Sequence, residues 1–464
     1  MSEAKIRQLF RTLSLADLSI LASSSMAPAY SLAAVMGLVV AAAGTGAPLA
    51  LIVSTIPIAF IAIGFMRLAT EKPSAGGAYT WARIAFGNRV GWFTAVLIII
   101  GYYFGTVATA FPAGVYTISI AMPHATATPL AIAIAGICWT AFSAYFLIIG
   151  ARPTARLSAV FLAAEVGALV LISVLALIRP FSGTPALGNP GISMGATGLV
   201  GLIVGAVLSI WVSAGWEIST YSSEESTGAP TTPGAGALVG LLGTMALVWF
   251  CMLAFLHVGS VGGFTSHQDD ALAYVAQRLG GGWISLLMVA NVLVSSAAAL
   301  WTTMQLLSRA VFAMGRDKLL PASLALVHPK FGTPWVAILV VSIPVALILL
   351  VSGFASSAQH TLATVVSGSS IFLGSTFIIT GLACAWLHFR QGAGQRHILS
   401  GIALPTVGAL WTLAFLIFDV WKQQETFVQG LTLAGIACAL IFSFSAGRWV
   451  RLKQPMMVPR EEEG

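Results

Sequence analysis

Charged side chains are scarce in this sequence, since only 8% of its 464 residues are Asp, Glu, Lys or Arg. Soluble domains contain about 25%, so the composition excludes an ordinary soluble protein. Hydrophobic residues make up 58% of the chain and form long runs. Such runs fit membrane-spanning helices, whereas the strands of a membrane barrel show only short alternating segments. An all-α integral membrane protein is therefore predicted.

Clusters of reactive or metal-binding residues are also lacking. The sequence has no Gly-x-x-x-x-Gly-Lys-Ser/Thr loop, so ATP is not expected to drive it directly. Its apolar runs hold no nucleophile–base pair, and no basic stripe is interleaved with aromatic residues. We therefore expect no enzyme, no cofactor, no metal site and no nucleic-acid partner. The four cysteines all lie in apolar runs without metal-ligand spacing, which is typical of packing; they are Cys138, Cys251, Cys384 and Cys438.

Twelve apolar runs are long enough to cross a bilayer. A single membrane domain over 1–464 is expected, with a cytoplasmic N-terminus at 1–17 and a cytoplasmic tail at 447–464. The longest segments outside the spans are 180–197, expected to be a loop, and 259–281, expected to contain a short amphipathic helix. The predicted spans are 18–40, 47–68, 90–120, 129–149, 157–178, 198–222, 236–258, 282–312, 334–353, 361–387, 399–419 and 428–446.

Basic residues indicate the orientation. With both termini in the cytoplasm, only Arg179, Arg278 and Lys422 of the 22 basic residues fall outside. Cytoplasmic loops carry the excess of Lys and Arg, so the reverse topology is disfavoured. The chain leads directly into a full span, so no cleavable signal peptide is expected. A multi-pass protein of the plasma (inner) membrane is predicted.

Helix-breaking residues interrupt two of the spans. The segment Trp211-Val-Ser-Ala-Gly215-Trp-Glu217 places a carboxylate beside a glycine at membrane depth, where charge is costly. In the first span, Ser23-Ser-Ser-Met-Ala-Pro28 combines hydroxyl residues with a proline. Irregular backbone within a membrane is tolerated only where it is buried in protein or lines a cavity. Two broken helices at matching positions of two halves indicate the binding site of a secondary transporter.

Three motifs resemble the amino acid–polyamine–organocation (APC) superfamily. The first, Pro73-Ser-Ala-Gly-Gly-Ala-Tyr79, is similar to its Pro-x-x-Gly-Gly-x-Tyr loop. The second, from Ser308 to Pro321 and on to Pro334, resembles the loop between spans 8 and 9. The third is the break at Trp211–Glu217 with the trailing Glu224-Glu225.

This resemblance implies a LeuT-like fold with an inverted 5+5 repeat, in which helices 1 and 6 are broken, plus two extra helices. The first repeat would cover 18–178, the second 198–387, and spans 11 and 12 would occupy 399–446. Substrate would bind between the two breaks near the bilayer midplane. In the arginine/agmatine antiporters that the third motif resembles, the tryptophan matching Trp211 is a gate.

Ser25, Met26, Ala27 and Pro28 are the substrate-binding candidates in the first span. Freed amides and the positive end of a broken helix attract a carboxylate, and freed carbonyls attract an ammonium group. The alternative is a proline kink with serines bonded back to the helix. Relatives usually carry Gly-Ser/Thr-Gly here, and Pro28 offers no N–H. The substrate could therefore be an amine or a differently shaped acid as well as an amino acid.

Aromatic candidates lie in spans 3 and 6. Trp211 stands one turn before Gly215, where it would close over the substrate or stack on a cation; packing is the alternative. Trp216 and Tyr102 are further candidates for the cavity wall, with packing again as the alternative. Glycine at position 215 is expected to form the break itself.

Two carboxyl residues are candidates for coupling or gating. Glu217 would be either a titrating switch or a hydrogen-bonded strut that holds the break open. Glu165 aligns with a position where proton-coupled and sodium-independent relatives commonly carry lysine. It would bind a proton, ligate a cation, or lie buried as a neutral carboxyl, since desolvation disfavours the ionised form. Ser295 and Ser296 would complete a sodium site or serve ordinary helix packing.

These features predict a secondary active transporter for a small amino acid or amine, with proton-coupled symport by alternating access. An exchanger of the same fold and a membrane sensor that moves no cargo are the alternatives. The expected partners are a small-molecule substrate, protons and the lipid bilayer.

Overall fold

A computed structural model of the chain describes residues 8–122, 128–178, 198–268, 270–354, 358–392, 397–422 and 426–449. The described residues form helices, and their only strand-like feature is one isolated bridge between Leu13 and Ser226. The expected loop at 180–197 and the tail beyond residue 449 lie outside the described residues.

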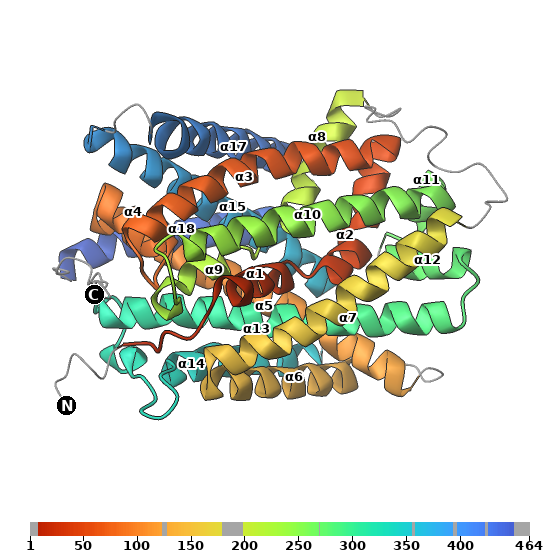
Figure 1. Cartoon of the computed structure of the whole chain (residues 1–464), viewed down its shortest axis with the longest axis horizontal. Helices are drawn as coiled ribbons and strands as arrows, with labels where there is room; N and C mark the ends of the chain where they lie inside the picture. Colours follow the sequence, from red (N-terminus) through yellow and green to blue (C-terminus); the bar gives the residue numbers. More distant parts are fainter. Residues whose placement is uncertain are drawn as a thin grey trace.

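The first half of the chain contains α1 to α7, and the long helices run along the longest axis of the molecule (Figure 1). Each range predicted for a span in this half is occupied by helix. The elements are α1 (Leu15–Met26), α2 (Pro28–Ala43), η2 (Gly44–Gly46), α3 (Ala47–Glu71), α4 (Ala78–Phe86), α5 (Asn88–Ala121), α6 (Pro129–Ile149) and α7 (Ala151–Ile178).

The second half begins with a short helix pair around the break and continues with long helices. The expected amphipathic helix within 259–281 is present as α12. The elements are α8 (Gly198–Val212), α9 (Ile218–Tyr221), η3 (Ser223–Glu225), α10 (Thr232–Val258), α11 (Val261–Ser266), α12 (Ala271–Arg278), α13 (Trp283–Arg316), η4 (Ala322–Ala325), α14 (Trp335–Ser352), α15 (Ala358–Arg390), η5 (Ile398–Ala403), α17 (Leu404–Lys422) and α18 (Thr426–Trp449).

Nine stretches of the described chain are long and apolar enough to cross a membrane. Twelve ranges were predicted, and the continuity of some helices and the short length of others explain the difference. The first stretch, Leu15–Glu71, contains two predicted ranges because α2, η2 and α3 follow one another closely. Two further apolar helices, Gly198–Val212 and Leu433–Phe444, are shorter than a full span; α8 is short because the break at Gly215 ends it early.

The outer surface is apolar, as a lipid-facing surface requires. Val160 on α7, Val351 on α14 and Ile417 on α17 are all largely exposed. Exposed apolar surface of this extent is unusual for a soluble monomer. The chain is therefore a multi-pass membrane protein.

The two predicted breaks are present and lie inside the bundle. Helix α1 ends at Met26, Ala27 takes a left-handed conformation (φ 48°, ψ 64°), and α2 starts at Pro28. Helix α8 ends at Val212, and the chain passes through Gly215 (φ +109°) before α9. Packing of α1 against α10 and of α2 against α8 keeps both breaks buried.

Candidate functional site

The two breaks contact each other directly. A Cβ placed on Gly215 would lie 2.7 Å from the carbonyl oxygen of Ser25. That approach is closer than side-chain carbons tolerate, and the positive φ at Gly215 is also unfavourable for other residues. Glycine is therefore required at position 215 for two reasons. The breaks in the two halves of the chain pack directly against each other.

Buried side chains fix the amides of the first break. The Ala29 N–H donates to Oε1 of Glu165 on α7 at 2.8 Å, and the Tyr30 N–H donates to Oγ of Ser295 on α13 at 3.0 Å. The Tyr30 hydroxyl in turn donates to the carbonyl of Ala108 on α5 at 2.9 Å. Glu165 is fully buried, and its Oε2 has no hydrogen-bond partner. The start of α2 is thus tied to three other helices.

Glu217 organises the second break in a similar way. Its Oε2 accepts the Gly215 N–H at 3.0 Å, and its Oε1 accepts the hydroxyl of Tyr102 on α5. The side chain is 1% exposed. Both carboxylate oxygens are therefore engaged, and the Glu217 side chain bonds the break to α5.

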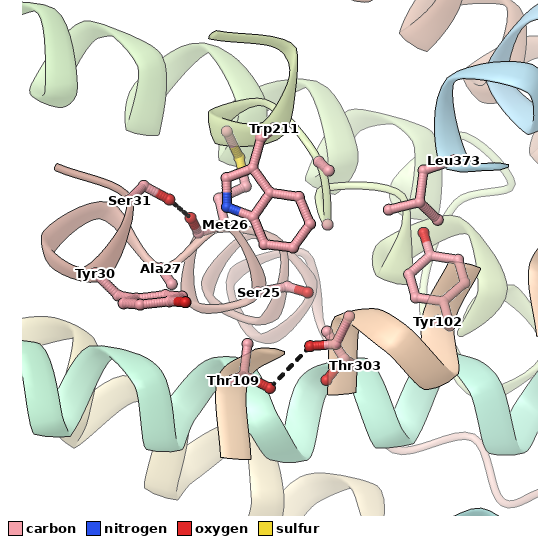
Figure 2. A pocket seen from close by; sticks show the side chains of 13 residues that line it. Ser25, Met26, Ala27, Tyr30, Ser31, Tyr102, Thr109, Trp211, Thr303 and Leu373 are labelled. Atoms are coloured by element: carbon pink, nitrogen blue, oxygen red, sulfur yellow. Dashed lines mark hydrogen bonds between the residues drawn. The ribbon is translucent and has the colours of Figure 1, made fainter. Parts of the chain in front are cut away.

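A cavity of about 40 Å³ lies where the breaks face α5 and α13. Trp211 lies on one side and Tyr102 with Leu373 on another, and the Ser25 hydroxyl points into the space between Trp211 and Thr303 (Figure 2). Ser25 is 6% exposed and its Oγ has no partner. The cavity is lined by Ser25, Met26, Ala27, Tyr30, Ser31, Tyr102, Gly105, Thr109, Trp211, Ala214, Gly215, Thr303 and Leu373.

The structure brings most of the substrate-binding candidates together. Ser25, Met26, Ala27, Tyr102, Trp211 and Gly215 line the cavity, whereas two other candidates do not. Pro28 is absent from the wall, and Trp216 is fully buried elsewhere, with its ring 5.0 Å from that of Phe65 and 5.6 Å from that of Phe377. Trp216 is therefore a packing residue in this conformation.

The coupling and gating candidates lie behind the cavity wall. Glu165, Glu217 and Ser295 each bond a group of the breaks, as described above, and none of them lines the cavity. Ser296 instead donates to the carbonyl of Val292 in its own helix at 2.8 Å. The two serines thus have different roles, although they are neighbours.

Several cavity residues were not predicted from the sequence. They are Tyr30, Ser31, Gly105, Thr109, Ala214, Thr303 and Leu373. Most of them lie in continuous apolar helices, where every face is buried against protein or lipid and no periodic pattern separates a cavity-lining position from its neighbours. The threonines Thr109 and Thr303 were the available signal, since hydroxyl residues stand out in apolar helices.

The cavity wall contains no lysine, arginine or histidine among its thirteen described residues. Within the described part of the chain, no group of three His, Cys, Asp or Glu residues could hold a metal ion. The polar surface of the cavity is supplied by hydroxyl groups, backbone groups and the Trp211 ring. This chemistry binds a small polar or cationic molecule by hydrogen bonds and cation–π contact.

Buried ion pairs close one end of the bundle. Arg309 on α13 makes two hydrogen bonds of 2.9 Å with Glu225, and Arg316 makes two of 2.7 Å with Glu224. Arg83 on α4 pairs with Asp317 at 2.9 Å. Burial and the Asp317 charge raise the pKa of the neighbouring Tyr79 hydroxyl.

The motif loop Pro73–Tyr79 packs into this closed end. The Ala75 N–H donates to Oε1 of Glu224 at 2.7 Å, and a Cβ on Gly77 would lie 2.6 Å from the Tyr221 ring. The N-terminal segment joins it as well, since the amides of Thr12 and Leu13 donate to the Glu225 carbonyl. Parts of all three sequence motifs and the N-terminal segment therefore meet at this end of the bundle.

Comparison with known proteins agrees with this geometry. A family model described as amino acid permease matches residues 13–444. The chain is 25% identical to the low-affinity putrescine importer PlaP of Escherichia coli (strain K12), over 92% of both chains. It is 26% identical to cationic amino acid transporter 5 of Arabidopsis thaliana, covering 82% of this chain and 66% of that one. It is 24% identical to the branched-chain amino acid permease BcaP of Lactococcus lactis, covering 62% and 64%.

Proposed function

Because the chain belongs to the amino acid permease family, we propose that it is a secondary active transporter that moves a small amino acid or amine by proton-coupled symport. The observation that carries this proposal is the contact between the two helix breaks beside a small cavity that both of them line. Relatives named for putrescine, cationic amino acids and branched-chain amino acids support a small amine or amino acid as the cargo.

Alternating access would proceed around the cavity. The cavity is small, and buried ion pairs hold one end of the bundle shut. Trp211 is only partly buried beside the cavity and lies at the end of α8, next to the break. A shift of this short segment would open the cavity while the long helices α5 and α13 stay in place.

Proton coupling would use Glu165. Its carboxyl group is completely buried, and one of its oxygens has no partner. An ionised carboxylate in this environment is costly unless a proton or a cation joins it. Its other oxygen binds the first break through the Ala29 amide, so protonation of Glu165 would alter the contact that positions the substrate site.

The architecture that fits this mechanism has twelve spans in an inverted 5+5 repeat, with both termini in the cytoplasm. It is supported by the broken helices at the start of each half and by the distribution of basic residues. The first repeat would cover 18–178 and the second 198–387, and α17 and α18 would lie outside the repeat. The closed end with its ion pairs would then face the cytoplasm.

The experiment that tests the proposal is uptake into proteoliposomes. A radiolabelled panel of amino acids, amines and carboxylates is offered with an inward proton gradient, with a sodium gradient, and with neither. The same panel is offered to Glu165→Gln, which keeps the size of the side chain and removes its acid. Ser296→Ala is the matched control, because Ser296 bonds only within its own helix.

We expect uptake that follows the proton gradient, is lost in Glu165→Gln and is retained in Ser296→Ala. Uptake that follows sodium instead would contradict proton coupling. Uptake that requires internal substrate under every gradient would identify an exchanger. Binding without uptake under any gradient would identify a sensor and contradict transport.

A further inference from the structure

One amide of each helix break is already bonded to a carboxylate of the protein. Free N–H groups at helix N-termini are the usual anion sites of broken helices. Here the Ala29 N–H donates to Glu165 at 2.8 Å, and the Gly215 N–H donates to Glu217 at 3.0 Å. Gly215 lines the cavity, so Glu217 holds an amide that an external carboxylate would otherwise find in the cavity wall, whereas Ala29 and Glu165 lie behind that wall.

The other amides of the first break are also engaged. Ala27 donates to the Ser24 carbonyl at 3.3 Å, Ser31 donates to the Ala27 carbonyl at 2.7 Å, and Tyr30 donates to Ser295. Pro28 has no N–H. From Ala27 to Ser31, every amide of the break has a partner, and none is left to bind a ligand.

At the second break, three amides of the irregular segment are also engaged. The amides of Ser213 and Ala214 each donate at 3.1 Å to carbonyls of the last turn of α8, and Gly215 donates to Glu217. The described cavity wall supplies no cationic side chain that could replace these amides. A carboxylate entering the cavity would lose its hydration without gaining the charge-assisted hydrogen bonds that offset that loss.

The same surroundings suit a cation. The Ser25 Oγ is free to accept a hydrogen bond, and Trp211 presents an aromatic ring. Glu217 lies directly behind the wall, since Tyr102 and Gly215 both line the cavity and both bond its carboxylate. A buried carboxylate one side chain away attracts an ammonium group, because the interior screens charge less than water does.

We infer that the substrate of this site is a cationic amine that lacks a carboxylate, and that Glu217 helps to exclude amino acids by occupying the Gly215 amide of the cavity wall. This inference rests on the proposed transport function and narrows its substrate class. An amine and its parent amino acid differ only in the carboxylate, since both carry the same ammonium group. The measurable quantity is therefore the affinity ratio within such a pair.

Binding and uptake of matched pairs test the inference on the full-length protein in proteoliposomes. The pairs are putrescine with ornithine, agmatine with arginine, and tyramine with tyrosine. For at least one pair, the amine is expected to bind more than about tenfold tighter than its amino acid, the loss typical of an unpaired buried charge. If every amino acid binds as tightly as its amine, the inference is wrong while transport stands. If no compound of the wider panel is transported, the proposed function itself fails.

Discussion

At the scale of single residues, the hydroxyl of Tyr102 has a specific role that its neighbour lacks. It donates to the buried carboxylate of Glu217, whereas the Tyr103 hydroxyl donates to the Val340 carbonyl at the exposed side of α5. The two adjacent tyrosines thus face different surroundings on one helix. Tyr102 links the long helix α5 to the irregular second break.

Tyr102→Phe should therefore impair transport and lower stability. The change leaves one oxygen of a buried carboxylate unpaired, which costs about 1–3 kcal/mol. The measurements are the melting temperature in detergent and uptake in proteoliposomes. Tyr103→Phe is the matched control and should stay close to the wild type in both. Equal effects of the two variants would contradict the role of Tyr102 as a partner of Glu217.

Gly215→Ala should abolish transport while the protein still folds as a membrane bundle. The added Cβ would meet the Ser25 carbonyl at 2.7 Å, and alanine is strained at a φ of +109°. Strain of this kind costs about 1–3 kcal/mol, and it falls on the contact between the breaks. Gly243→Ala is the control, since nothing lies within 4 Å of its added carbon. Uptake at wild-type rates by Gly215→Ala would show that the contact is dispensable.

The site residues were predictable from the sequence only where they disturb an apolar run. Gly215, Glu217, Ser25 and Pro28 stand out because glycine, charge, hydroxyl groups and proline are costly within a span. The contact of Glu165 with the Ala29 amide was not predictable, because it joins residues 136 positions apart. Trp216 was a candidate for the cavity wall with packing as the alternative, and its ring packs against Phe65.

At the scale of elements, the trailing Glu224-Glu225 segment connects α9 to three other parts of the chain. Glu225 binds Arg309 of α13 through its side chain and the N-terminal segment through its carbonyl. Glu224 binds Arg316 of the same helix and the amide of Ala75. Any motion of the second break at this end must therefore disturb buried charges.

Arg309→Met should destabilise the closed end by about 3–5 kcal/mol, because it leaves the Glu225 carboxylate buried without its partner. Removing both charges in Arg309→Met with Glu225→Gln should recover part of this loss, since no unpaired charge remains. Melting temperatures of the single and double variants measure the coupling. Arg152→Met, at an exposed position, is the control. A double variant no more stable than Arg309→Met would contradict the pairing.

The elements themselves were largely predictable, because apolar runs of span length have few other solutions in a membrane. The ranges predicted for spans are occupied by helices, and both breaks are where glycine and proline placed them. The short helix α4 (Ala78–Phe86) was not predicted. It follows the Gly76-Gly77 turn and is held by Arg83 to Asp317, a contact with a distant part of the chain.

At the scale of the whole molecule, the distribution of basic residues and the fold indicate the same orientation in the membrane. The closed end contains Arg83, Arg309 and Arg316, and the N-terminal segment is bonded to it. Helix α12 with Arg278 belongs to the segment that the sequence places on the opposite side of the membrane. An excess of basic residues marks the cytoplasmic side, so the closed end is expected to face the cytoplasm.

Labelling of introduced cysteines tests this orientation. In a background in which the four native cysteines are replaced by alanine, Lys330→Cys and Gln277→Cys each add one thiol at an exposed position. A membrane-impermeant maleimide applied to intact cells should label Gln277→Cys, and Lys330→Cys only after the membrane is permeabilised. The opposite pattern would invert the topology and place the ion pairs at the outer face. Uptake by both variants would show that the labelled protein is folded and active. The labelling pattern then decides which side of the membrane the closed end faces.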